Sequence, residues 1–302
     1  MPFFVGGNPL KINIVRMLPK KQVSAILTFI KGKEKLLESG IFNRVLRDDI
    51  FRLLETQDCV VLYYPKENEE NNGFHVEHPF RGELKHFVYI NTAQLKETQI
   101  FAAAHELGHI WKIVEFMREC GFDGGDDWEE WIINRFAAEL LMPEEEFKYF
   151  FNTEIEKLEE KYRHESIPVN YIIRVITAIM NEFLTPFKSV VHRLYELGII
   201  YEKDAYLILE HYDNGVFKDY SEKVAREQGY SRLYQSPDKL KHIDNLREFL
   251  DKAREKDAMP EKWLVSMYEL FDFEHDNTVD SSLSENISIF EGGNSNAKAC
   301  GN

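Results

Sequence analysis

Two histidines and a glutamate stand in a spacing that suits a metal ion. Residues 105–109 read H-E-L-G-H and lie in an apolar stretch, residues 100–117, whose apolar side chains recur at helical intervals. Histidines four residues apart share one helix face, about 6 Å apart along the axis, so both imidazoles can bind one zinc ion. Glu106 then lies beside the ion, where it can accept a proton from a zinc-bound water. This H-E-x-x-H arrangement predicts a zinc hydrolase, and specifically a metallopeptidase.

Chance is the alternative explanation of the motif. With average residue usage, a chain of 302 residues contains this pattern on the order of once in a hundred, and its histidines are then ordinary helix residues. Gly108 argues against chance, because glycine inside a helix costs about 1 kcal/mol relative to alanine. We therefore expect another element or a ligand to approach the helix closely at Gly108.

A second helix is predicted after the motif, over residues 126–143. The glycine pair 124–125 breaks the chain before it, and Asp126 or Asp127 is expected to cap its first turn. Pro143 ends the helix, because proline cannot continue the backbone hydrogen-bond ladder. This helix carries the acidic residues from which a third metal ligand is expected.

Three glutamates of this second helix are candidates by residue type, namely Glu129, Glu130 and Glu139. Glu130 is preferred because Asn134 follows one turn later on the same face. From there Asn134 can hydrogen-bond a ligand histidine and fix its tautomer, as the supporting residues of zinc sites usually do. Glu129 and Glu139 are interpreted as a solvated acidic face.

The two motifs together resemble the ImmA/IrrE family of zinc metallopeptidases, on H-E-L-G-H and the downstream E-x-x-x-N-x-F-A-A-x-L-L-M-P. Residues 87–91 and 99–104 look like that family's strand and entry into the active-site helix. Residues 167–200 resemble its trailing helical segment, so the resemblance covers about residues 35–200. One departure is Ile133, where the family commonly has a small residue.

The resemblance implies a site and a fold. His105, His109 and Glu130 are its zinc (Zn2+) ligands, and Glu106 is its general base. The implied fold is α+β, with a mainly helical zincin-like core, a minimal gluzincin, and a small β-sheet. A helical hairpin follows this core. Beyond residue 201 the resemblance fades, and a C-terminal helical extension is expected from the amphipathic pattern alone.

The sequence is compatible with two functions. The resemblance implies a zinc-dependent endopeptidase that cleaves a DNA-binding repressor of the helix-turn-helix type, which controls a mobile-element or stress programme. The alternative is a regulatory binding protein that retains the zinc site and acts by sequestering its partner. An intact Glu106 favours the enzyme, because a purely structural zinc has no need of that carboxylate.

The sequence also predicts the elements around the site. Residues 20–55 have a helical pattern, residues 59–64 a strand pattern, and residues 74–91 the pattern of a strand pair that turns near 79–82. Amphipathic stripes over 238–254 and 260–273 predict two further helices.

We therefore expect a metallopeptidase domain over residues 1–200. Its helix-turn-helix-like segment, at about 167–200, is interpreted as a structural helical hairpin. A helical extension is expected at 201–275, and a disordered tail at 276–302, which is rich in Ser, Asn and Gly.

Composition limits location and partners. No run approaches 18 apolar residues, the N-terminus lacks the pattern of a signal peptide, and the three cysteines (Cys59, Cys120 and Cys300) form no framework. These features predict a cytoplasmic protein that does not associate with membranes. The net charge of −15 opposes direct binding of nucleic acid. The acidic clusters are interpreted mainly as solvated faces, and preference for a basic protein partner is their functional alternative.

The roles of several residues are not settled by the sequence. The stabilising group for the oxyanion is not identified by any pattern, and His164, Tyr171 and Tyr63 are its candidates. His75, His78 and His86 are interpreted as surface histidines, one of which could touch the cleft.

Overall fold

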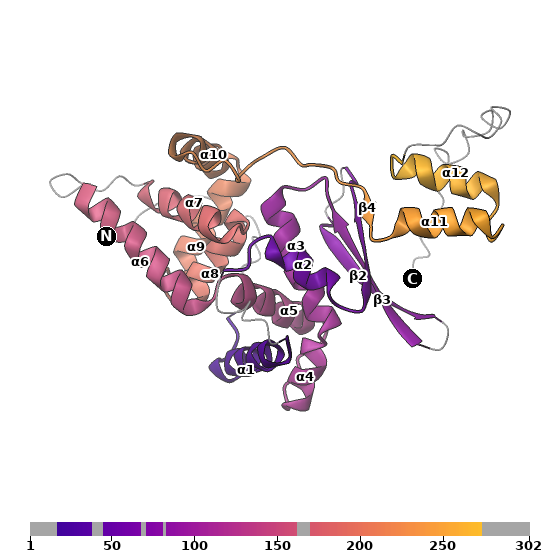
Figure 1. Ribbon diagram of the computed structural model, residues 1–302. Coiled ribbons are helices and arrows are strands. Elements are labelled where there is room, and N and C mark those ends of the chain that lie inside the picture. Colours follow the sequence, from indigo (N-terminus) through magenta and orange to yellow (C-terminus); the bar gives the residue numbers. More distant parts are fainter. Residues whose placement is uncertain (1–16, 38–44, 68–70, 81–82, 162–169, 274–302) are drawn as a thin grey trace, which may run out of the picture. The chain divides into compact units, whose positions relative to one another are not determined.

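The structure is a computed structural model that describes residues 17–37, 45–67, 71–80, 83–161 and 170–273. Within these ranges the contacts divide the chain after Asp244 into two compact units (Figure 1). The domain boundaries predicted from the sequence, including the one at residue 200, stay predictions. The expected tail at 276–302 lies outside the described residues.

The first unit contains a mixed sheet with the strand order β2-β3-β1-β4. In this order β1 (Cys59–Tyr64) pairs in parallel with β3 (Glu83–Asn91), and β2 (Gly73–Phe80) pairs antiparallel with β3. The strand and the strand pair predicted at these positions are confirmed. Because β2 pairs only with β3 among the described strands, its other side is a sheet edge.

The short strand β4 (His242–Ile243) was not predicted. The sequence pattern placed residues 238–254 in one amphipathic helix, but β4 pairs antiparallel with Leu62 and Tyr63 and the helix begins later. A two-residue strand has no periodicity of its own, so only the distant partner strand can define it.

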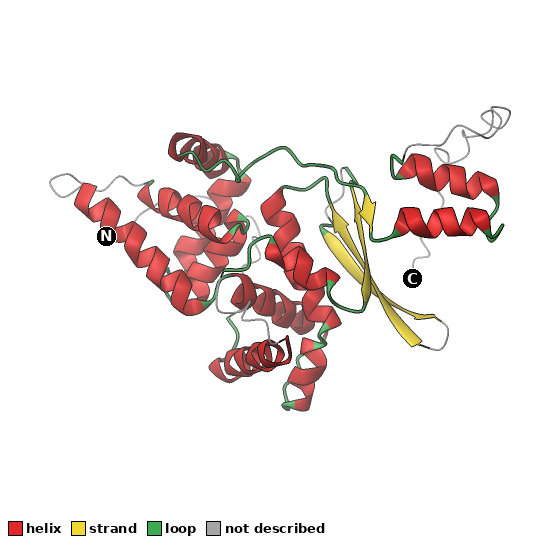
Figure 2. Ribbon diagram, in the orientation of Figure 1, coloured by secondary structure: helices red, strands yellow, loops and turns green. Residues whose placement is uncertain are grey.

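Helices make up most of the first unit (Figure 2). The predicted α+β, mainly helical fold is confirmed. In chain order the helices of this unit are α1 (Lys20–Leu37), α2 (Asp49–Glu55), α3 (Lys96–Ile110), α4 (Ile113–Glu119), α5 (Asp126–Leu141), α6 (Glu144–Lys161), α7 (Tyr171–Phe183), α8 (Phe187–Glu196), α9 (Glu202–Asp213) and α10 (Val216–Gln228).

The motif helix α3 contacts α5 as well as strands β2 and β3. The two helices α3 and α5 approach each other closely at Gly108. A Cβ atom at this position would lie 3.0 Å from Cδ1 of Phe136 and 3.1 Å from Cγ2 of Ile133. The close approach predicted at Gly108 is therefore confirmed, and α5 is the element that makes it.

The stretch predicted as one helix over residues 100–117 is broken. α3 ends at Ile110 and α4 begins at Ile113, because Lys112 has left-handed backbone angles, φ 60° and ψ 45°. The change of direction lets α4 pack against α1 and α5 and bury Val114 and Met117. No Gly or Pro marks the break, so local sequence gave no signal for it.

The start of α5 differs in detail from the prediction. Its first helical residue is Asp126, and the preceding N-cap residue is Gly125 with φ 83°. An aspartate was expected as the cap. Glycine stands there because L side chains rarely adopt a positive φ.

The interpretation of Glu139 as part of a solvated face was wrong. Its carboxylate is buried and accepts hydrogen bonds from Nη1 and Nη2 of Arg193, at 3.0 and 2.6 Å, and from Nε of Arg135, at 2.9 Å. Burial alone would raise the pKa of Glu139, but the guanidinium groups of Arg193 and Arg135 outweigh burial and lower it. Glu129 lies at the surface, where it pairs with Arg118.

The helical hairpin predicted within residues 167–200 is confirmed by α7 and α8. The second unit contains α11 (Leu246–Glu255) and α12 (Glu261–Leu270), which enclose a small core around Leu250 and Tyr268. Among the described residues, no helix has the length and apolar character needed to cross a membrane.

Candidate metal centre

Helices α3 and α5 bring together the three side chains predicted as metal ligands. His105 and His109 come from α3 and Glu130 comes from the first turns of α5. One ligand atom from each of the three lies within 4.8 Å of the others, and Nε2 of His105 is 3.5 Å from Oε2 of Glu130. Two imidazoles and a carboxylate therefore surround a space of the size of one metal ion.

Asn134 holds the ring of His105 in place. Its Oδ1 atom is 3.1 Å from Nδ1 of His105, the hydrogen bond that the spacing of Glu130 and Asn134 predicted. Because the amide oxygen accepts, Nδ1 of His105 carries the proton. The lone pair of Nε2 is then directed toward Glu130.

Both histidines are in the form that binds metals. Burial lowers the pKa of His105, and the carboxylate of Glu130 opposes this effect. Burial and the neighbouring His105 also lower the pKa of His109. Neutral imidazole is the form that binds metal ions, so near neutral pH neither ring has to lose a proton before it binds a metal.

Glu106 lies next to this group without belonging to it. Its side chain is 3% exposed, and its Oε2 atom has no hydrogen-bond partner among the described residues. Burial, followed by the nearby charge of Glu130, raises the pKa of Glu106 to about 8. A buried carboxyl oxygen without a partner is costly, and it indicates a group prepared for a ligand.

Strand β2 begins beside Glu106. A Cβ atom at Gly73 would lie 2.9 Å from the carbonyl oxygen of Tyr89 and 3.2 Å from Oε1 of Glu106. Glycine is needed at this position because any side chain would collide with the backbone of β3.

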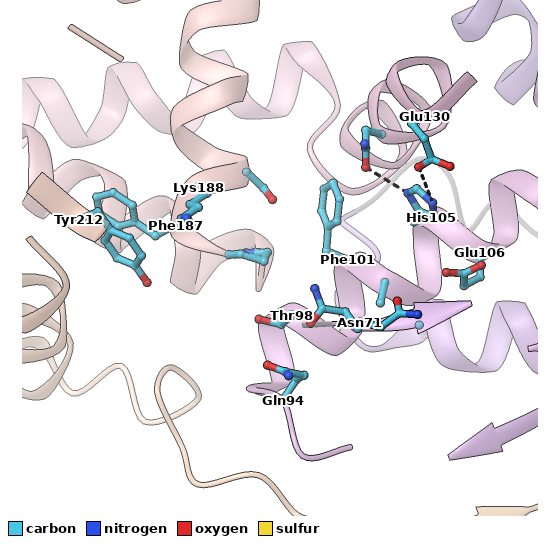
Figure 3. Close-up of a pocket in the computed structure, with 16 residues that line it drawn as sticks. Asn71, Gln94, Thr98, Phe101, His105, Glu106, Glu130, Phe187, Lys188 and Tyr212 are labelled. Carbon is cyan, nitrogen blue, oxygen red and sulfur yellow. Dashed lines mark hydrogen bonds and ion pairs between the residues drawn. The ribbon is translucent and has the colours of Figure 1, made fainter. Parts of the chain in front are cut away.

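The site opens into a cleft of about 590 Å³ (Figure 3). His105, Glu106, Glu130 and Asn134 line one part of it. Figure 3 shows Phe187, Lys188 and Tyr212 on the other side, from α8 and α9. The remaining lining residues are Asn71, Asn72, Gly73, Gln94, Thr98, Phe101, Ala102, Pro186 and Ser189.

Sequence reasoning missed this opposite wall. Lys188 forms an ion pair with Asp213, with 2.6 Å between Nζ and Oδ1, and Phe187 stacks on Tyr212 with ring centroids 4.1 Å apart. These residues belong to the helical hairpin, which was interpreted as structural, and to α9, to which the sequence assigned no role. Nothing in their local pattern relates them to residues 105–134.

The two oxyanion candidates among the described residues are not brought to the cleft. Neither Tyr63 nor Tyr171 lines it, and the hydroxyl of Tyr63 donates to Glu55 at 2.7 Å. His164 lies outside the described residues. Cys120 is exposed and does not belong to the ligand group.

Comparison with known proteins identifies the domain that holds this site. Residues 54–195 match a peptidase family model described as the IrrE N-terminal-like domain, so the resemblance to the ImmA/IrrE family is confirmed for this part of the chain. No curated protein matches the chain significantly.

A solved structure described as a Mycobacterium tuberculosis transcriptional regulator is similar at 16% identity and a TM-score of 0.37. The match covers 59% of this chain and 47% of that chain, so the chain corresponds to about half of that structure's length. The family match alone identifies the domain.

Proposed function

We propose that this chain is a zinc-dependent endopeptidase, with His105, His109 and Glu130 as zinc ligands and Glu106 as general base. The observation that carries the proposal is the convergence of these three ligand atoms within 4.8 Å beside a buried, unpartnered carboxyl oxygen. Two histidines and one carboxylate are a donor set of catalytic zinc, which keeps a fourth position open. The residues present therefore fit the metal that the family implies.

Glu106 carries the proton transfers in this mechanism. When bound, zinc supplies Lewis acidity that lowers the pKa of water and polarises a peptide carbonyl. Glu106 accepts a proton from the attacking water and passes it to the departing amine nitrogen. Its raised pKa suits both steps, because acid–base catalysis is most effective when the pKa is near the working pH.

The edge of the sheet supports a polypeptide substrate. Strand β2 pairs on one side only among the described strands, and Gly73 at its start lines the cleft. An extended peptide can add to such an edge through backbone hydrogen bonds. A peptide bound there would run past Glu106 into the cleft.

The proposed substrate is a DNA-binding repressor of the helix-turn-helix type. Two facts support this choice, the family to which the domain belongs and the net charge of −15, which favours a basic protein as partner. The same charge disfavours a direct role of this chain on DNA.

Cleavage of such a repressor by the zinc-loaded chain tests the proposal. Mixing this chain with a purified repressor encoded beside it should give one or two discrete fragments, a chelator should abolish them, and added zinc should restore them. Stable co-elution without cleavage, in the presence of zinc, would refute the peptidase and support sequestration instead.

Metal analysis of variants tests the ligand assignment. Zinc content should fall sharply in His105→Ala, His109→Ala and Glu130→Ala. Glu129→Ala is the matched control, because Glu129 is the preceding carboxylate of α5 and pairs with Arg118 instead. Full zinc retention by Glu130→Ala, with loss in Glu129→Ala, would overturn the assignment.

A further inference from the structure

A second cluster of histidine and glutamate side chains lies on the hairpin of β2 and β3. Glu77 of β2 is the register partner of His86 of β3, and His75 lies two residues before Glu77. Residues two apart on a strand share a face, as do register partners. The pairing of β2 with β3 thus places His75, Glu77 and His86 on one face of the hairpin.

The three side chains lie close together, and His86 contacts both of the others. Nε2 of His75 is 2.8 Å from Nδ1 of His86, which is 3.5 Å from Oε1 of Glu77. One ligand atom from each residue lies within 4.8 Å of the others, the same limit that the group of His105 meets. None of the three lines the cleft.

We propose that His75, Glu77 and His86 form a second binding site for a transition-metal ion of the zinc class. Imidazole nitrogens with one carboxylate suit zinc and its neighbours, whereas magnesium and calcium prefer oxygen ligands. The proposal does not rest on the function proposed above, because the two sites share no ligand.

The spacing of the ligand atoms allows an ion to enter with small side-chain movements. Two nitrogens at zinc–nitrogen distances of about 2.0–2.1 Å in tetrahedral geometry are about 3.3 Å apart. The two rings, now 2.8 Å apart as hydrogen-bond partners, must therefore separate by about half an ångström. Glu77 is exposed, so its carboxylate has room to turn toward the ion.

Two neighbours set the properties of this hairpin site. The ring of His75 stacks on the ring of His109, with centroids 5.7 Å apart, so the two metal sites are adjacent. Nζ of Lys112 is 3.7 Å from Oε1 of Glu77 and competes with a cation for that carboxylate. Replacing this ammonium with a neutral group should therefore strengthen metal binding at the hairpin site.

Equilibrium dialysis against zinc, with the bound ions counted per chain, tests the proposal. The wild-type chain should bind two ions, and His86→Ala and Glu77→Gln should each bind one. His78→Ala is the matched control, since His78 is exposed on the same strand but faces the opposite side, and it should keep two. Lys112→Gln should keep two ions and reach half-saturation of the weaker site at a lower zinc concentration.

The variant His105→Ala separates the two metal sites. It should lose the ion of the first site and keep the ion of the hairpin. Equal counts in the wild type and in both Glu77→Gln and His86→Ala would overturn the hairpin site whatever the peptidase assay gives. Unchanged zinc in His105→Ala together with a loss in His86→Ala would refute the first site and support the second. Circular dichroism establishes that each variant is folded.

Discussion

Replacing Glu106 by glutamine is expected to stabilise the metal-free protein while removing its activity. The side chain is 3% exposed, and its burial raises the pKa from 4.5 to about 8. A carboxyl group whose pKa is raised in the folded protein destabilises the fold at every pH above the pKa that the group has in the unfolded chain. The reason is that, as the pH rises, the group loses its proton in the unfolded chain before it does so in the folded one. Glutamine has nearly the same volume and no charge to bury, so Glu106→Gln escapes this penalty.

The magnitude follows from the two pKa values of Glu106. Linkage between 4.5 in the unfolded chain and about 8 in the folded chain gives a penalty of about 3 kcal/mol at pH 7 and about 1 kcal/mol at pH 5. Glu106→Gln should therefore have the larger free energy of unfolding, by these amounts. The gain should rise with pH and level off above pH 8.

Urea unfolding of the metal-free wild type and Glu106→Gln at pH 5 and pH 7 measures this gain. Glu119→Gln serves as control, because Glu119 is exposed on α4 and its replacement should change stability by less than about 0.5 kcal/mol at either pH. Zinc-loaded Glu106→Gln should cleave substrate about 10²–10⁴-fold more slowly, as expected from the loss of a general base. A stability difference that is absent, or that does not increase with pH, would refute the burial argument. Wild-type cleavage by this variant would refute the role of Glu106 as base.

Three further substitutions test the supporting structure. Asn134→Ala should lower metal affinity or activity about 10–100-fold, since the ring of His105 loses its orienting acceptor, and unchanged zinc affinity and turnover would contradict that role. Gly108→Val should destabilise the fold by about 1–3 kcal/mol in urea unfolding, because its side chain meets atoms of α5 already 3.0–3.1 Å from the Cβ position, and a neutral result would show that α5 can move away. Arg193→Met should cost about 3–5 kcal/mol, because it leaves the buried carboxylate of Glu139 with too few donors, and a loss below about 1 kcal/mol would mean that Arg135 suffices.

The ligand group could be predicted from the sequence because each half of it is local. His105 and His109 are four residues apart on one helix, as are Glu130 and Asn134 on the next, and helical geometry places each pair on one face. At Gly108 the sequence predicted a close approach by another element or a ligand, and the structure shows that α5 makes this approach. The sequence therefore contained both faces of the candidate site, and the structure identified the element that packs at Gly108.

Burial and backbone direction depended on the tertiary structure. Glutamate side chains are usually solvated, yet two arginines, one of them 54 residues away, make the burial of Glu139 possible. Lys112 adopts a left-handed conformation without a Gly or Pro signal, because packing of α4 against α1 and α5 outweighs the local backbone cost.

The sequence by itself determined the helical fold class, the strand pair and the candidate ligand residues. The opposite wall of the cleft and the cluster of the hairpin were decided only by the tertiary structure. Lys188 and Tyr212 reach the cleft from α8 and α9, and His75 meets His86 through the register of two strands. The physical reason is that helical and strand periodicity fix which side chains share a face, whereas the partner of that face is set by long-range packing.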